Sequence, residues 1–187
     1  MKNSLKNIFK ERILVLDGAM GTAIQDRNLT AHDFGGEAFE GCNEYLVITR
    51  PDIIQAVHED YLAAGADIIE TNTFGGTDFV LGEFGLQDYV AEVNTKSVEL
   101  AKAACLKYST KDKPRFVAGA IGPTTKALSV TGGISFDDLA KSFSDQAYYL
   151  TKAGQAVEAL YASIEHMNPL YVGLNCATGP EFMRDHL

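Results

Sequence analysis

Short apolar runs alternate with longer helical patterns along this chain, and this alternation restricts the fold more than any other feature of the sequence. The apolar runs are Ile13–Leu16, Ala66–Glu70, Arg115–Ile121 and Leu170–Leu174. Apolar residues recur at helical spacing in Pro51–Ala64, in Asp88–Tyr108, from Ser135 onward and in Gln155–Glu165. Buried strands separated by helices are typical of parallel sheets with right-handed crossovers. The sequence therefore predicts an α/β fold, either a barrel or a doubly wound sheet.

Start and stop signals flank two of the expected helices. Pro51 stands at the start of one helix and Gly65 just past its end, while Ser135 is followed three residues later by an aspartate, as in a capping box. Apolar positions keep one register from Ser135 to Glu165. We therefore expect a single helix there, kinked near Gly154.

The composition is that of one soluble globular domain. The chain has 187 residues, of which 46% are hydrophobic and 22% charged, and a mean hydropathy of -0.05. A net charge of -9 with scattered basic residues excludes nucleic acid as an expected partner. Lysines interrupt the apolar residues of Met1–Lys10, which predicts a short helix rather than a signal peptide, and no apolar run is long enough to span a membrane.

Three cysteines, Cys42, Cys105 and Cys176, are too few and too widely spaced for a disulfide framework or a CxxC metal site. This cysteine usage favours the reducing cytoplasm. A lone cysteine at a strand end is more often a small buried hydrophobe than a ligand. The histidines are His32, His58, His166 and His186, and we expect them on loops or helix surfaces without a chemical role.

Polar residues and glycines follow each expected strand. They are Asp17, Gly18 and Thr22, then Glu70, Asn72 and Thr73, then Gly122 and Thr124, and finally Asn175 and Cys176. The carboxyl ends of parallel strands share one edge of a sheet, so these residues should converge. Their combination predicts a small-molecule site at this edge.

Each motif alone has a simpler interpretation. Asp17-Gly18 is a common turn pair, and Gly18 and Gly21 do not complete a phosphate-binding loop. Asn72 and Thr73 are residues that often cap a following helix or turn. The prediction of a site therefore depends on all the loops together.

Three segments carry a resemblance to a known family. LDGAMGT at Leu16–Thr22, the long segment Pro51–Phe74 and VGLNCATG at Val172–Gly179 resemble the homocysteine S-methyltransferase domain of cobalamin-dependent methionine synthase. The resemblance implies a (β/α)8 TIM-type barrel in which zinc, held by three cysteines, binds the homocysteine sulfur. The resulting thiolate would take a methyl group from methylcobalamin, held by a separate module, to give methionine.

The resemblance also implies roles for individual residues. Asp17 would hold the substrate ammonium group, and the backbone of Gly18, Ala19, Met20 and Gly21, in a substrate-binding loop that runs to Thr22, would receive the carboxylate. Glu70 and Asn72 would line the pocket. Cys176 would be the first zinc ligand, with Asn175 beside the metal.

The sequence departs from the family pattern in two places. Two strands of the barrel are absent at a seam near residues 153–156, and the paired cysteines that would complete the zinc site are missing. We therefore expect one incomplete homocysteine-binding domain over residues 1–187, a partial barrel that retains about four parallel βα units. We expect weak or no zinc binding, because catalytic zinc needs about three protein ligands. The open sheet edges favour a homodimer.

These considerations rank three possible functions of the chain. The leading hypothesis is a methyltransferase chain of the methionine synthase type that is inactive alone, with homocysteine and cobalamin- and folate-binding modules as partners. The alternative is a non-catalytic half-barrel that binds a small amino acid or pairs with a second half-barrel. A different α/β enzyme, with Asp17 or Glu70 as a general base, ranks last because no residue that would perturb either carboxylate is identifiable.

Overall fold

The computed structural model describes residues 5–126 and 133–153. Its helices are α1 (Leu5–Ile8), α2 (Met20–Gln25), α3 (Leu46–Thr49), α4 (Pro51–Ala64), α5 (Asp78–Gly82), α6 (Val90–Tyr108) and α7 (Phe136–Lys152). Three 3-10 turns are η1 (Glu37–Phe39), η2 (Asn43–Tyr45) and η3 (Gln87–Tyr89). The strands are β1 (Ile68–Glu70) and β2 (Phe116–Ala118).

Strands β1 and β2 are parallel, with Ile68 opposite Phe116, and α6 connects them in sequence. Leu16 forms a parallel bridge to Ile68, so the segment before Asp17 runs along the other edge of β1. The predicted mixture of helices with parallel strands is thus confirmed for the described residues. Among these residues, the sheet has only the two named strands.

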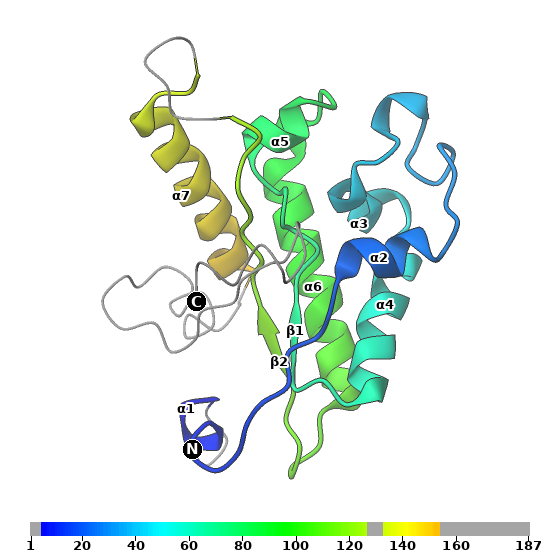
Figure 1. Ribbon diagram of the computed structural model, residues 1–187, viewed down its shortest axis with the longest axis vertical. Helices are drawn as coiled ribbons and strands as arrows, with labels where there is room; N and C mark the ends of the chain where they lie inside the picture. The colour runs from blue at the N-terminus through cyan, green and yellow to red at the C-terminus, as the bar shows by residue number, and fades with distance from the viewer. Residues whose placement is uncertain (1–4, 127–132, 154–187) are drawn as a thin grey trace, which may run out of the picture.

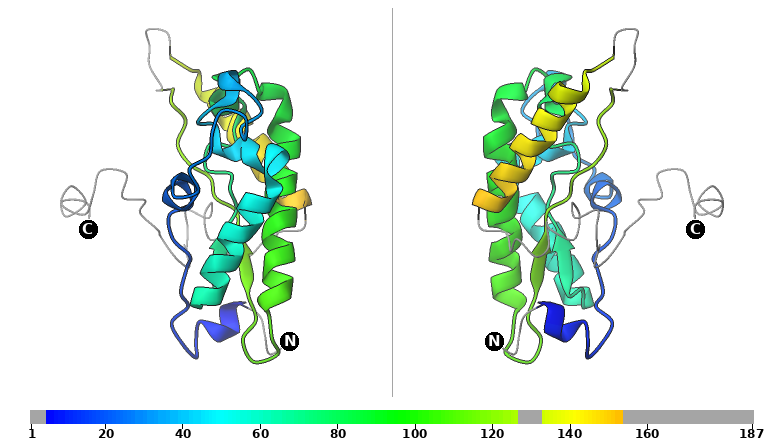
Figure 2. Two further views of the ribbon diagram at one scale, coloured as in Figure 1. Left: turned by 90° about the vertical axis from the view of Figure 1, so that its right-hand side faces the viewer. Right: turned by 90° about the vertical axis from the view of Figure 1, so that its left-hand side faces the viewer.

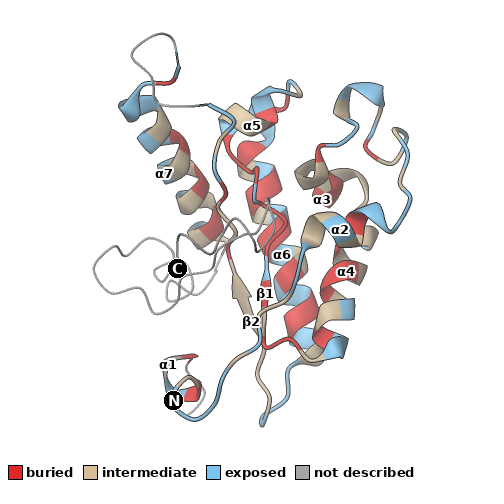
Figure 3. Ribbon diagram, viewed as in Figure 1, coloured by how far each residue is buried: buried red, intermediate tan, exposed pale blue. Residues whose placement is uncertain are grey.

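Three long helices form a layer beside the strands. Helix α6 contacts both strands and lies between α4 and α7 (Figure 1), and α7 lies obliquely across α6 (Figure 2). Buried residues concentrate along α6, on the inward sides of α4 and α7, and in the segment after β1 (Figure 3). This layer fixes the strand ends at which the candidate site lies. No helix of the described residues is both long and apolar enough to cross a membrane.

Both punctuated helices begin where the sequence predicts, and α4 also ends there. Helix α4 starts at Pro51, and Gly65 ends it in the left-handed conformation with φ of 115°. Ser135 caps α7, its hydroxyl accepting a hydrogen bond from the backbone N–H of Asp138 at 3.1 Å. The short helix expected near the N-terminus is present as α1. These residues act on the backbone beside them, so they determine helix ends independently of distant parts of the chain.

The first expected strand, Ile13–Leu16, does not form as predicted. Leu16 alone makes a bridge, while Ile13 and Val15 are 90% and 56% exposed rather than buried on both faces. The segment is instead anchored by charge, because Arg12 donates two hydrogen bonds of 2.7 Å to the carboxylate of buried Asp67. Ile13 and Val15 are two residues apart and so share one face of the segment, and their exposure shows that this face is largely uncovered.

The second strand starts at Ile68 instead of Ala66, and the third strand ends early, at Ala118 instead of Ile121, for a specific reason. The regular pairing of β1 with β2 ends at Ala118, and beyond it threonine hydroxyls form hydrogen bonds to the backbone. The backbone N–H of Ala120 donates to the Thr71 hydroxyl at 3.0 Å, and the Thr73 hydroxyl donates to the Ala120 carbonyl at 2.7 Å. The chain therefore leaves regular strand geometry at the edge where function is expected.

The buried face of α4 also differs from the expectation. His58, expected on a loop or helix surface, has no exposed surface, whereas Ala64 of the expected apolar face is exposed. Leu62 replaces Ala64 in the buried stripe, which rotates the face slightly around the helix. His32 does lie exposed on a loop.

Several expectations fall outside the described residues. They are the fourth strand Leu170–Leu174, the helical continuation from Gly154 to Glu165, the seam near 153–156, and residues His166, His186, Asn175 and Cys176. The described part of the last helix ends at Lys152.

Candidate functional site

The first two strand-end loops meet as the sequence predicts. The backbone N–H of Glu70, the last residue of β1, donates to Asp17 Oδ2 at 3.0 Å. The Leu16–Ile68 bridge and a 2.9 Å hydrogen bond from the Asp17 N–H to the Ile68 carbonyl hold the two loops in register. Asp17 and Glu70, 53 residues apart in sequence, are thus neighbours at one sheet edge.

Asp17 has the electrostatics of a cation acceptor. Its Oδ1 atom is buried and has no hydrogen-bond partner among the described residues. Burial raises the pKa of Asp17 to about 7, partly opposed by the hydrogen bond from Glu70. A buried carboxylate with an unused oxygen is stabilised by an incoming ammonium group, which would lower this pKa again.

The loop after Asp17 turns directly into α2. Ala19 is extended and precedes the helix, and its carbonyl accepts from the N–H of Ala23 at 3.2 Å. Met20 packs against the apolar cluster that includes Ile24, while Thr22 is exposed. Gly21 has open space around it, with no atom within 4 Å of where a Cβ would lie. The predicted carboxylate-binding residues therefore form one strand-to-helix turn.

A glycine is needed at position 18 because the backbone there lies close to the Tyr61 side chain. A Cβ at this position would lie 3.1 Å from the ring of Tyr61 on α4. The Tyr61 hydroxyl donates to the Ala19 carbonyl at 3.3 Å. The sequence carries no signal for this contact, since it joins a strand-end loop to the end of a helix 42 residues away.

Glu70 and Asn72 differ in what their side chains do. Glu70 is largely exposed, and desolvation raises the pKa of its carboxyl group. Asn72 is buried, and its side-chain amide donates to the Asn43 backbone carbonyl at 2.7 Å. The backbone carbonyl of Asn72 accepts from the Ser97 hydroxyl at 3.1 Å. Asn72 thus ties the second loop to η2 and α6, and its contact with a substrate stays a prediction.

Buried polar contacts fix the rest of the second loop. Gln146 of α7 donates to the Thr73 carbonyl at 2.7 Å, and Glu44 accepts from the Gly75 N–H at 2.8 Å. Burial raises the pKa of Glu44. The Gly122 N–H donates to the Phe74 carbonyl at 2.9 Å, and a Cβ on Gly122 would come within 2.6 Å of that oxygen. Sequence inspection missed Glu44 and Gln146, since their partners are distant backbone groups.

The described cysteines do not form a metal site. Cys42 lies in the loop before Pro51 and Cys105 inside α6, and both are buried. Burial raises the pKa of Cys42 to about 11 and that of Cys105 to about 12, so both thiols stay protonated near neutral pH. No cluster of three potential metal ligands occurs within residues 5–126 and 133–153. These residues therefore do not fit the zinc that the resemblance implies.

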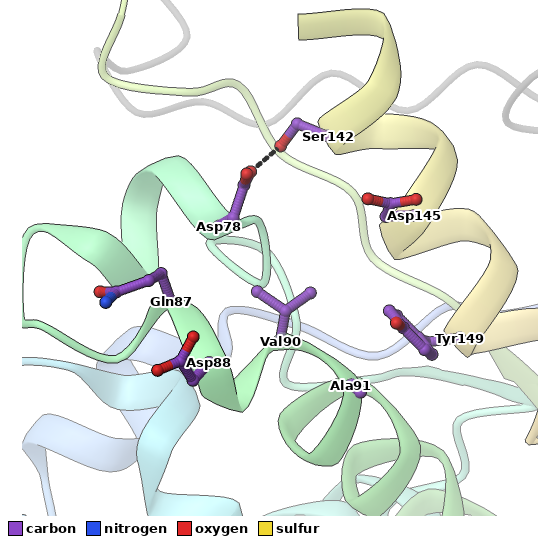
Figure 4. Close-up of a pocket in the computed structure, with 8 residues that line it drawn as sticks. All are labelled: Asp78, Gln87, Asp88, Val90, Ala91, Ser142, Asp145 and Tyr149. Carbon is purple, nitrogen blue, oxygen red and sulfur yellow. Dashed lines mark hydrogen bonds between the residues drawn. The ribbon is translucent and has the colours of Figure 1, made fainter. Parts of the chain in front are cut away.

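A separate cavity of about 230 Å³ lies among the helices, away from the strand ends (Figure 4). It is lined by Asp78, Gln87, Asp88, Val90, Ala91, Ser142, Asp145 and Tyr149. The Ser142 hydroxyl donates to the Asp78 carboxylate, which closes one side of the cavity. None of the predicted site residues lines it.

Comparisons with known proteins place the chain in a family. The family model for homocysteine S-methyltransferase matches residues 14–154 and 149–187, two segments that meet beside the expected seam. The homocysteine methyltransferase MmuM from Escherichia coli is similar in its oxidized form, with 25% identity, 85% of this chain covered and a TM-score of 0.65. Its metallated form gives 24% identity, the same coverage and a TM-score of 0.65. This chain spans 60% and 61% of the length of those structures. The chain belongs to the homocysteine S-methyltransferase family.

Proposed function

We propose that this chain binds homocysteine at the strand-end loops and belongs to a methyl-transfer system of the methionine synthase type. Residues 1–187 would form one homocysteine-binding domain, built as a partial (β/α)8 barrel. The observation that carries the proposal is the pairing of Asp17 with the Glu70 N–H, which leaves Asp17 Oδ1 buried and without a hydrogen-bond partner among residues 5–126 and 133–153. We propose that the substrate ammonium group is the partner of this oxygen. The family match supports homocysteine as the ligand.

The chemistry is methyl transfer to sulfur. The homocysteine thiolate attacks the methyl carbon, the bond from that carbon to its donor breaks with its electron pair left on the donor, and the new carbon–sulfur bond gives methionine. A free thiol of pKa about 8.5 is mostly protonated at neutral pH, so the sulfur must lose its proton first. Metal-bound thiols are deprotonated outright, but the described residues do not supply such a site. We therefore propose that Cys176, with Asn175 beside it, is one part of an incomplete zinc site and that the chain alone is inactive.

The partners follow from the same proposal. A methyl donor held elsewhere requires a second module, so cobalamin- and folate-binding modules would act on the homocysteine held here. We propose the reducing cytoplasm as the location of this system, because the cysteine usage does not indicate a disulfide framework.

Homocysteine binding by the purified chain tests the proposal. We expect saturable binding by calorimetry that Asp17→Asn weakens about ten- to a hundred-fold, because a charge-assisted hydrogen bond to the ammonium group is lost. Asp112→Asn is the control, since Asp112 is exposed on the loop before β2. The absence of binding by the unaltered chain would overturn the proposal.

The pH dependence of binding gives a second test of Asp17. Its carboxyl must be ionised to hold an ammonium group, and with a pKa of about 7 the ionised fraction rises steeply through neutral pH. Affinity should increase roughly ten- to thirty-fold between about pH 5.5 and 7.5. Binding to Asp17→Asn should be nearly flat over this range, and an equally steep profile in that variant would assign the titration to another group.

A second candidate is a non-catalytic half-barrel that binds a small amino acid or pairs with a second half-barrel. It is favoured by the lack of a three-ligand metal cluster among the described residues. Zinc content and homocysteine-dependent methyl transfer from methylcobalamin separate the two candidates. Turnover that appears only when the cobalamin- and folate-binding modules are added supports the enzyme, whereas homocysteine binding without turnover even then supports the half-barrel. Stoichiometric zinc in the chain alone would contradict the incomplete zinc site.

A further inference from the structure

Tyr61 connects the end of α4 to the turn that follows Asp17. It lies outside the predicted site, yet its ring approaches Gly18 and its hydroxyl reaches the Ala19 carbonyl. We propose that Tyr61 is a positioning residue that sets the backbone of this turn for recognition of the substrate carboxylate. The inference rests on the proposed homocysteine function, and it assigns a role to a residue that would not itself touch the substrate.

The backbone of Tyr61 provides a rigid platform. Its carbonyl accepts hydrogen bonds from the N–H groups of Gly65 at 3.2 Å and Ala66 at 3.0 Å, which close the end of α4. Its side chain packs against the apolar cluster that includes Leu62 and Ile69. Because both backbone and ring are held, the hydroxyl has little freedom to move away from the turn.

The target of the hydroxyl is the first carbonyl of the turn into α2. The Ala19 oxygen accepts from the Tyr61 hydroxyl at 3.3 Å and from the Ala23 N–H at 3.2 Å. A carbonyl fixed in this way also fixes the peptide plane that it shares with the Met20 N–H. The direction of the Met20 N–H is therefore set from α4. Free N–H groups at such a turn are donors suited to a carboxylate.

The contact with Gly18 restrains the same turn from the other side. A methyl group at Gly18 would lie 3.1 Å from the Tyr61 ring and its hydroxyl oxygen, so the backbone lies directly against the aromatic side chain. Burial and the nearby charge of Asp17 both raise the pKa of Tyr61, which keeps the phenol protonated as a donor. The ring sterically limits the backbone conformations open to the turn, and the hydrogen bond from the hydroxyl favours one of those that remain.

Two ligands and two variants test this role. Homocysteine and 3-aminopropane-1-thiol share the amine and the thiol, but only homocysteine has a carboxylate. Tyr61→Phe removes the hydroxyl and keeps the ring, and Tyr148→Phe on the exposed side of α7 is the matched control. Binding of both ligands would be measured by calorimetry, and exchange of the Ala23 amide hydrogen by NMR.

We expect Tyr61→Phe to weaken homocysteine binding about three- to ten-fold and to leave binding of the aminothiol unchanged, because one neutral hydrogen bond to the turn is lost. The Ala23 amide should exchange faster, while amides of α6 should not. Equal weakening for both ligands, or no change in either, would overturn the inference. If the unaltered chain binds no homocysteine, the proposed function fails, and unchanged Ala23 exchange in Tyr61→Phe would then independently refute the restraint.

Discussion

His58 lies in the middle of α4, and neither of its ring nitrogens has a hydrogen-bond partner among the described residues. Burial lowers the pKa of this imidazole to about 4. A buried histidine without a partner is neutral in the folded protein, whereas in the unfolded chain it takes up a proton near pH 6.5. Its spacing from Ile54 and Leu62 places it in the apolar stripe, so the periodicity of α4 could have indicated its burial.

Folding stability should therefore fall as the solution is acidified. The stability contribution of His58 is fully present above about pH 6.5 and is lost as pH falls toward 4, because only the unfolded state binds the proton in that window. Between about pH 7.5 and 5 the loss should be about 2 kcal/mol. Urea unfolding at the two pH values measures it.

His58→Leu should remove most of this acid sensitivity, and His32→Leu, on an exposed loop, should leave it intact. An unchanged pH profile in His58→Leu would mean that other groups, such as the buried carboxylates, control the acid response.

At the scale of elements, the boundaries that the sequence predicts are those with local chemical signals. Helices α4 and α7 begin at Pro51 and just after Ser135 because those residues act on the backbone beside them. The short helices α2 and α3 have no side-chain cap, and α5 has only the Thr77 cap; all three have six residues or fewer. Tertiary contacts decide such short helices, since isolated ones are unstable in water.

The left-handed end of α4 gives a test at this scale. Gly65 has φ of 115°, a conformation that side chains disfavour, so Gly65→Ala should lower the free energy of unfolding by about 1 kcal/mol. Gly82 lies within α5, and a methyl group added there would make only ordinary van der Waals contacts, so Gly82→Ala should be neutral or slightly stabilising. Urea unfolding distinguishes the two, and equal effects would refute the role of the backbone conformation.

Like the helix boundaries, the candidate site was only partly predictable from the sequence. The rule that parallel strands share one edge predicts the meeting of Asp17 and Glu70, which the structure confirms. It does not predict Tyr61 or Glu44, whose roles depend on how helix ends and 3-10 turns pack against the loops. A pattern of residue types carries no information on such distances.

At the scale of the whole molecule, one of the sheet edges that stay unpaired among the described residues carries exposed apolar side chains. Ile13 and Val15 are exposed at the margin of the strand pairing, whereas the opposite side of β1 pairs with β2. Exposed apolar side chains on an unpaired edge favour association with another chain. A homodimer thus remains a prediction for this protein.

Sedimentation velocity tests that prediction. Ile13→Lys should lower the concentration-dependent association of the chain without altering its unfolding midpoint, because the Ile13 side chain is 90% exposed. Leu106→Lys, at a residue 82% exposed on α6, is the control for simply adding charge. Equal loss of association in both variants would argue against the strand edge as the interface.

The contacts of β1, β2 and α7 follow the order of the chain. Arg12 pairs with Asp67, β1 with β2 and Gln146 of α7 with Thr73, so each contact joins a segment to one synthesised before it. Domains emerging from the ribosome can fold from the N-terminal side as they are made. The turn after Asp17 could therefore be in place while translation of the remaining chain is still under way.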